Sequence, residues 1–173
     1  MEYTDGKNVK VFELDLKDAQ NLKLKTMKKA GIDHDWIAYI PVDFNNESWV
    51  EKILASSFDK TKKSFFMIKG VTAYLSEEGV RDTLKKVADM SAIGSVVTQD
   101  FFLKEFIKRV QRLSATMRAL DLFGIDMSED EDVKKSIESL LKDIGLTLTN
   151  LSLYGEKWKT KKPFCAITEA EKN

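Results

Sequence analysis

The sequence has few of the residues that build disulfide frameworks and metal centres. Among its 173 residues there is one cysteine, Cys165, and one histidine, His34. A single cysteine cannot form a disulfide within the chain, and these two residues do not make up a Cys/His zinc site. We therefore expect no bound metal, and we interpret Cys165 as an inert, buried thiol.

The sequence also lacks a long apolar segment and an excess of charge. No apolar run approaches the roughly 20 residues that a helix needs to cross a bilayer, and the polar start at residues 1–6 does not resemble a signal peptide. Basic and acidic residues both number 28, so the net charge favours neither nucleic acid nor an anionic membrane as a partner. These features predict a cytoplasmic protein.

The apolar residues that are present alternate between strand-like and helix-like patterns. We predict four strands, each followed by a helical pattern, at residues 9–15, 36–43, 64–68 and 95–98. The first helix should bury Ala19, Leu22, Met27 and Ala30 and end at Gly31. Pro41 cannot donate to a ladder, which places the second strand at a sheet edge. One long amphipathic helix is predicted over 102–122, with Phe106, Val110, Leu113 and Met117 inside.

The periodicity of apolar residues changes near the end of the chain. Residues 146–153 alternate apolar and polar positions with period two, and 164–168 form a second apolar run after a lysine-rich turn. Two strands with no helix between them should pair antiparallel, as a hairpin. Strand–helix units that end in a hairpin predict an α/β fold with a mostly parallel sheet, in a single domain over residues 1–173.

Candidate ligand-binding residues follow the carboxyl ends of the predicted strands, where sheets of this kind bind ligands. They are Asp15, Asp43 with Phe44, Lys69 with Gly70, and Gln99 with Asp100. An acid at such a strand end commonly accepts hydrogen bonds from ribose hydroxyls, which suits Asp15, and Asp43 beside the apolar Phe44 suits an adenine. Each acid has an alternative role as the cap of the helix that follows, and the spacing alone leaves both roles open.

Three segments resemble successive blocks of the leucine carboxyl methyltransferase family, in the same order and spacing. They are VFELD at 11–15, PVDF at 41–44 and FFMIKGVTAYLSEE at 65–78. The resemblance extends over roughly residues 9–102 and more weakly over 146–169. It implies a Rossmann-like class I methyltransferase fold with strand order 3-2-1-4-5-7-6. It also implies an S-adenosylmethionine-dependent O-methyltransferase that methylates a carboxyl or hydroxyl group of a small-molecule or carboxyl-bearing acceptor.

The resemblance assigns four residues to the cofactor. Asp15 matches the acid that binds the cofactor ribose, and Asp43 with Phe44 matches the pair that holds the adenine. Lys69 matches a position next to the cofactor where the family usually has glutamate, and a lysine there opposes the sulfonium charge. No catalytic residue is assigned, because a carboxylate acceptor is ionised near neutral pH and requires no general base. Tyr74 is a candidate for the wall of the substrate pocket.

The family's glycine-rich block, Gly-x-Gly-x-Asp-x-Arg, has no counterpart in the chain, in which Gly6 is the only glycine before Gly31. In the family this block forms the first, central strand and its turn. The resemblance therefore implies a truncated fold, the carboxyl-terminal portion without that strand. Unpaired strand edges would favour self-association as a homo-oligomer. A second hypothesis follows, a catalytically inactive methyltransferase-like module for binding or scaffolding.

Overall fold

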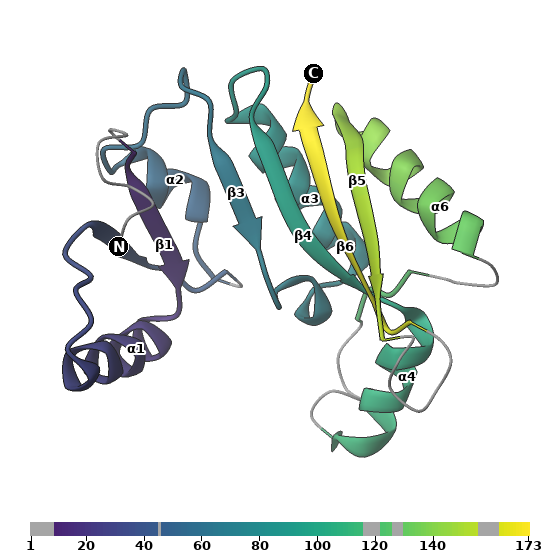
Figure 1. Cartoon of the computed structure of the whole chain (residues 1–173), viewed down its shortest axis with the longest axis horizontal. Coiled ribbons are helices and arrows are strands. Elements are labelled where there is room, and N and C mark those ends of the chain that lie inside the picture. The colour runs from purple at the N-terminus through teal and green to yellow at the C-terminus, as the bar shows by residue number, and fades with distance from the viewer. Residues whose placement is uncertain (1–8, 45, 116–121, 126–129, 156–162) are drawn as a thin grey trace. The chain divides into compact units, whose positions relative to one another are not determined.

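The computed structural model describes residues 9–44, 46–115, 122–125, 130–155 and 163–173. The chain divides into two compact units, Met1–Asp59 and Lys60–Asn173. We call them unit 1 and unit 2 and describe each by itself. Figure 1 gives the labels of the helices and strands. The single domain inferred from the sequence stays a prediction.

Unit 1 is a parallel strand–helix–strand segment followed by a short helix. Its elements are β1 (Val11–Asp15), α1 (Lys17–Ala30), β2 (Ile37–Pro41) and α2 (Trp49–Leu54). β1 and β2 pair in parallel. α1 ends at Gly31, whose φ of 67° is a left-handed conformation that glycine adopts without strain. Within the described residues β2 pairs with β1 alone, in agreement with the edge position inferred from Pro41.

The inner face of α1 differs from the predicted one. Leu22, which was expected to face the core, is 68% exposed, and Ala19 and Ala30 are exposed as well. The buried residue of this helix is Gln20, whose Nε2 donates a hydrogen bond to the backbone O of Glu13 at 3.0 Å. A polar contact with β1 therefore marks the inner face, and apolar spacing alone does not predict such a contact.

Unit 2 is built on a mixed sheet with strand order β3-β4-β6-β5. Its elements are β3 (Phe65–Ile68), η1 (Thr72–Tyr74), α3 (Glu77–Asp89), β4 (Val96–Phe102), α4 (Lys104–Leu113), α6 (Asp130–Lys142), β5 (Leu146–Tyr154) and β6 (Cys165–Lys172). β3 and β4 run parallel, and β6 is antiparallel to both β4 and β5. The C-terminal antiparallel hairpin predicted from the sequence is confirmed, as is the α/β fold class.

One face of the sheet in unit 2 packs against helices. Figure 1 shows α3 behind β4 and β6. Helices and strands both contribute side chains to this core that are at most 1% exposed, among them Leu84, Phe101, Ile137 and Ala166. On β6 the alternate residues Ile167 and Glu169 are exposed, because successive side chains of a strand point to opposite faces. The two faces of this sheet therefore have different surroundings.

The prediction of one long helix over residues 102–122 is wrong. β4 continues to Phe102, which pairs with Cys165 of β6, and α4 is a shorter helix that starts two residues later. The residue after α4 has extended backbone angles (φ −127°, ψ 122°), and Leu113 is 80% exposed. Met117 lies outside the described residues. Pairing with β6, which is distant in sequence, overrides the local helical pattern at the start of this segment.

Candidate functional site

Asp15 is exposed at the carboxyl end of β1. Its Oδ1 accepts a hydrogen bond from the backbone N–H of Leu16 at 2.7 Å. Leu16 is the N-cap residue of α1, so Asp15 does not take the capping position that was its alternative role. No partner of its Oδ2 is found in the described part of the chain. This oxygen is therefore available to accept hydrogen bonds from a ligand.

Asp43 follows β2 and organises a turn. Its backbone O accepts a hydrogen bond from the backbone N–H of Glu47 at 2.8 Å, and its Oδ2 accepts one from Asn46 Nδ2 at 2.7 Å. α2 begins further on, with Ser48 as its N-cap, so Asp43 does not cap this helix. Phe44, the next residue, is 36% exposed. The turn thus presents an acid beside an exposed aromatic ring.

Charged groups hold this turn in place. Glu47 Oε2 accepts a hydrogen bond from the Asp43 backbone N–H at 2.8 Å, and Glu47 Oε1 lies 2.7 Å from Lys52 Nζ. The hydrogen bond from Lys52 and then that from the Asp43 backbone lower the pKa of Glu47. Lys52 also donates to the backbone O of Pro41 at 2.8 Å. The segment that carries Asp43 and Phe44 is therefore tied to both β2 and α2.

The structure brings three of the four predicted cofactor residues to one end of the sheet in unit 1. β1 and β2 are parallel, and the backbone N–H of Val42 donates to the backbone O of Asp15 at 2.9 Å. Asp15, Asp43 and Phe44 therefore follow neighbouring strand ends, as ligand-binding residues of parallel sheets do. The fourth residue, Lys69, belongs to unit 2.

Lys69 is the first residue of the turn after β3. Hydrogen bonds to Asp100 of β4 stabilise this turn. The backbone N–H of Gly70 donates to Asp100 Oδ2 at 2.8 Å, and the Thr72 hydroxyl donates to the backbone O of Asp100 at 2.5 Å. Gly70 has a φ of 70°, which favours glycine. Lys69 is exposed, and its ammonium group makes no ion pair within the described residues. The sequence patterns did not identify Thr72, which is 3% exposed.

Gln99, also a candidate from its place at a strand end, lies inside unit 2. It is 2% exposed, and neither Oε1 nor Nε2 of its side chain has a partner in the described part of the chain. Its side chain shares a face of β4 with the buried Val97 and Phe101. An unpaired buried amide costs about 1–3 kcal/mol. Gln99 is therefore a polar residue of the core.

Cys165 and His34 have the surroundings of structural residues. Cys165 is 6% exposed, and burial, with a smaller effect from the Asp100 carboxylate, raises its pKa to about 11. The ring of His34 packs edge-on against that of Tyr39, with ring centres 5.9 Å apart. The described residues contain no group of three or more His, Cys, Asp or Glu side chains that could hold a metal ion. Among the same residues, no helix is long and apolar enough to cross a membrane.

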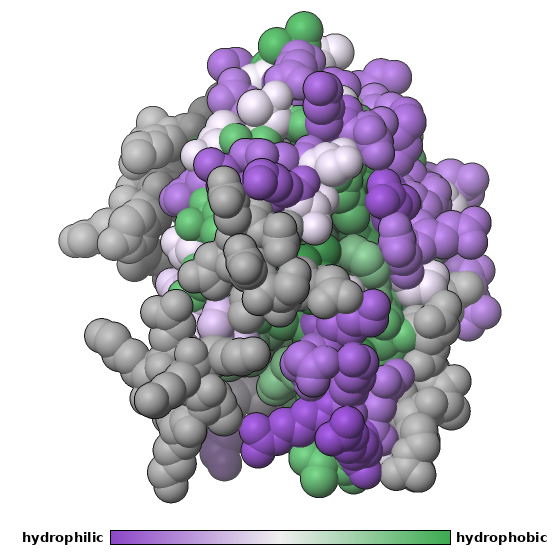
Figure 2. Space-filling view, turned by 90° about the vertical axis from the view of Figure 1, so that its right-hand side faces the viewer, coloured by the Kyte–Doolittle hydropathy of each residue, from purple (hydrophilic) through white to green (hydrophobic). Residues whose placement is uncertain are grey.

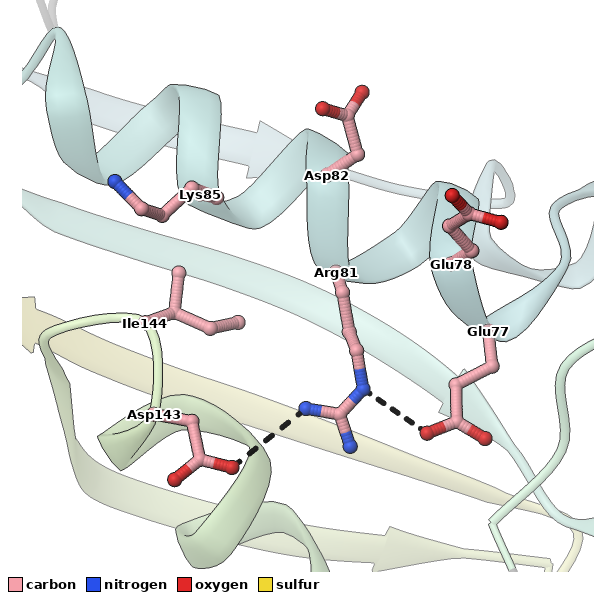
Figure 3. Close-up of a pocket in the computed structure, with 7 residues that line it drawn as sticks. All are labelled: Glu77, Glu78, Arg81, Asp82, Lys85, Asp143 and Ile144. Carbon is pink, nitrogen blue, oxygen red and sulfur yellow. Dashed lines mark hydrogen bonds and ion pairs between the residues drawn. The ribbon is translucent and has the colours of Figure 1, made fainter.

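A charged groove lies between α3 and the turn after α6 (Figure 3). It is lined by Glu77, Glu78, Arg81, Asp82, Lys85, Asp143 and Ile144. The Arg81 side chain points between two acids, with Nε 3.0 Å from Glu77 Oε1 and Nη1 3.8 Å from Asp143 Oδ2. No predicted cofactor residue lines this groove. Six of its seven lining residues are charged, which is unlike a typical cofactor pocket.

Solved structures identify the fold of the chain. Magnesium protoporphyrin IX methyltransferase from Synechocystis PCC 6803, with bound SAH, matches with a TM-score of 0.56 and 11% identity, over 94% of this chain and 64% of that chain. A DUF574 family protein from Streptomyces avermitilis matches with a TM-score of 0.64 and 14% identity, over 94% of this chain and 65% of that chain. An O-methyltransferase from neocarzinostatin biosynthesis, in complex with S-adenosylmethionine and 2-hydroxy-5-methyl naphthoic acid, matches with a TM-score of 0.59 and 13% identity, over 94% of this chain and 41% of that chain. The chain has the class I methyltransferase fold.

A sequence comparison also identifies the family of the chain. A family model described as leucine carboxyl methyltransferase matches residues 2–88, and the chain belongs to this family. The family uses S-adenosylmethionine. The chain spans 64% of the length of the magnesium protoporphyrin IX methyltransferase and 65% of that of the DUF574 family protein. A comparison with curated proteins gives no match.

Proposed function

We propose that the chain acts in S-adenosylmethionine-dependent O-methylation, and that Asp15, Asp43 and Phe44 bind the nucleoside half of the cofactor. The observation that carries this proposal is the grouping of the three residues at one end of the sheet in unit 1. Family membership supports the reaction class. The neighbour solved with S-adenosylmethionine and a hydroxynaphthoic acid supports a small-molecule acceptor with a carboxyl or hydroxyl group. The cytoplasm is the proposed location.

The residues in unit 1 fit a nucleoside. Asp15 Oδ2 is exposed with no partner in the described part of the chain, and an oxygen of this kind accepts hydrogen bonds from ribose hydroxyls. Phe44 offers an exposed ring against which an adenine could pack. The Asp43 carboxylate, which accepts a hydrogen bond from Asn46, lies beside this ring in the sequence. These are the donor and acceptor types that a nucleoside requires.

Methylation of a carboxylate requires no general acid or base from this chain. When bound, S-adenosylmethionine would supply an electrophilic methyl group. A carboxylate acceptor is already ionised near neutral pH, so the protein has to align the acceptor oxygen and exclude water. No residue in the described part of the chain stands out as the general base that a hydroxyl acceptor needs. A carboxyl group is therefore the acceptor we favour.

Calorimetric titration with S-adenosylmethionine and, separately, with S-adenosylhomocysteine tests the nucleoside site. Asp15→Asn should weaken the binding of both ligands by about tenfold or more, because a charged acceptor of a ribose hydroxyl is lost. Asp18→Asn is the matched control, since Asp18 is another exposed acid near the start of α1, and it should leave both affinities unchanged. Absence of binding of both ligands at millimolar concentration, or equal losses in the two variants, would contradict the proposal.

Lys69, which stands where the family usually has glutamate, favours the second candidate, a binding module without catalysis, because a positive charge at that position would oppose a sulfonium group. The two ligands separate these functions, since S-adenosylmethionine carries the sulfonium charge and S-adenosylhomocysteine does not. If Lys69 lies near this charge, Lys69→Glu should tighten the binding of S-adenosylmethionine about fivefold or more, as about 1 kcal/mol of charge interaction implies. The affinity for S-adenosylhomocysteine should not change. Equal changes for both ligands would show that Lys69 does not act on the sulfonium.

A further inference from the structure

α1 packs on the sheet of unit 1 through a polar side chain, whereas α6 of unit 2 packs through apolar ones. α6 buries Val133, Ile137, Leu140 and Leu141. Figure 2 shows the side of the molecule where α6 lies, and most of the described residues in this view are hydrophilic. α1 has a single buried residue, Gln20, which is 4% exposed. A buried polar group requires hydrogen-bonding partners, so the position of α1 depends on the partners of Gln20.

The partners of Gln20 lie on both sides of Asp15 in the chain. Its Nε2 donates to the backbone O of Glu13 at 3.0 Å, and its backbone N–H donates to the backbone O of Leu16 at 3.0 Å. Because the partner of the side chain is a carbonyl oxygen, the amide nitrogen and not Oε1 faces it. Gln20 thus holds the backbone both before and after Asp15.

Gln20 also reaches the neighbouring strand. Its Nε2 lies 3.5 Å from the backbone O of Ile40 in β2, a longer contact than the one to Glu13. Two residues further along each segment, the Val42 N–H donates to the backbone O of Asp15 at 2.9 Å. One side chain therefore contacts both strands close to the bond that joins their ends.

This arrangement sets the direction of the Asp15 carboxylate. One carboxylate oxygen accepts a bond from the Leu16 N–H, so the direction of the group follows from the backbone of residues 13–16. A site binds more tightly when the groups that contact the ligand are held in place before binding. We propose that Gln20 is a positioning residue, which acts through Asp15 on the affinity for the nucleoside half of the cofactor. This inference rests on the proposed function of Asp15.

A double-mutant cycle tests the inference by calorimetric titration with S-adenosylhomocysteine. Gln20→Met keeps an unbranched side chain of similar length and removes the donor. It should weaken binding about fivefold, because a hydrogen bond that orders the site is lost. In the Asp15→Asn background the same substitution should change the affinity less than about twofold, because the group through which Gln20 acts is already altered.

Thr26→Val is the matched control on the same helix. The Thr26 hydroxyl also donates to a backbone oxygen, that of Leu22 at 2.8 Å, but this bond stays within α1. Its loss should leave the affinity for S-adenosylhomocysteine unchanged in both backgrounds. A decrease equal to that of Gln20→Met would show that any loosening of α1 weakens the site, and it would exclude a specific role of Gln20.

A measurement on the unchanged chain decides the question if Gln20→Met does not fold. The side-chain NH₂ group of Gln20 gives its own NMR signal, and hydrogen bonding protects this group from exchange with solvent. We expect slow exchange that becomes slower with S-adenosylhomocysteine bound, because the ligand holds Asp15 and the backbone around it. The NH₂ group of Asn21, which is exposed on the same helix, should exchange fast in both states. Exchange at Gln20 that does not respond to the ligand would contradict the inference.

Failure of this inference can be distinguished from failure of the proposed function. Absence of S-adenosylhomocysteine binding to the unchanged chain, or binding that Asp15→Asn does not weaken, would overturn both. Binding that Asp15→Asn weakens, with equal losses from Gln20→Met in the two backgrounds, would show that Gln20 supports the fold alone. The nucleoside site would then stand without Gln20 as its positioning residue.

Discussion

Two acids at strand ends, Asp15 in unit 1 and Asp100 in unit 2, differ in what their carboxylates do. Asp100 Oδ2 accepts a hydrogen bond from the Gly70 backbone N–H, and its backbone O accepts one from the Thr72 hydroxyl, so it holds the turn after β3. Asp15 accepts one bond from its own neighbour and keeps an exposed oxygen. Asp15 is thus a better candidate for binding a ligand than Asp100, because one of its carboxylate oxygens has no partner in the described part of the chain.

We expect the largest difference between the two acids in their contribution to the free energy of unfolding. Asp100→Ala should lower the free energy of unfolding by about 2 kcal/mol, because the half-buried Gly70 N–H loses a charged acceptor. Asp15→Ala should lower it by less than about 0.5 kcal/mol, since water can replace the bond at an exposed site. Urea unfolding followed by circular dichroism measures both. Equal losses would remove the distinction between the two acids.

A smaller effect tests the turn that Asp100 holds. Gly70 and Gly31 have φ values of 70° and 67°, and a Cβ added to either would meet no atom within 4 Å. Alanine at either position should therefore cost about 1 kcal/mol from the backbone alone. Any additional cost of Gly70→Ala would come from its hydrogen bond to Asp100.

A double-mutant comparison isolates that additional cost. If the bond to Asp100 couples to the backbone of Gly70, the extra loss in Gly70→Ala should disappear in the Asp100→Ala background. Gly31→Ala should cost the same in both backgrounds, because it lies in the other unit. An extra cost at Gly70 that persists without the Asp100 carboxylate would mean that the turn is strained for another reason.

The sequence predicted the fold class correctly, whereas the cofactor site stays a prediction. Strand–helix alternation predicted the α/β class, and the period-two pattern at residues 146–153 predicted the hairpin. Both patterns are local, so they can be recognised from neighbouring residues in the sequence. The pairing of Phe102 with Cys165 is distant in sequence, so local periodicity placed the start of the helix over 102–122 too early. Strand-end positions identified Asp15, Asp43 and Phe44, which the structure groups. They could not separate Asp15 from Asp100, since hydrogen bonds across strands decide which carboxylate is already in use.

The smallest effect uses Cys165 as a reporter of the Asp100 charge. Burial, and then the Asp100 carboxylate, raise the pKa of this thiol to about 11, so iodoacetamide should react slowly near pH 8 and faster as the pH rises toward 11. Asp100→Asn removes the negative charge and should lower the pKa of Cys165, which moves the midpoint of the rate profile to lower pH. Asp15→Asn should leave the profile unchanged. Greater access to a loosened core would raise the rate by the same factor at every pH, so a profile that rises without a shift of its midpoint would exclude the charge of Asp100 as the cause.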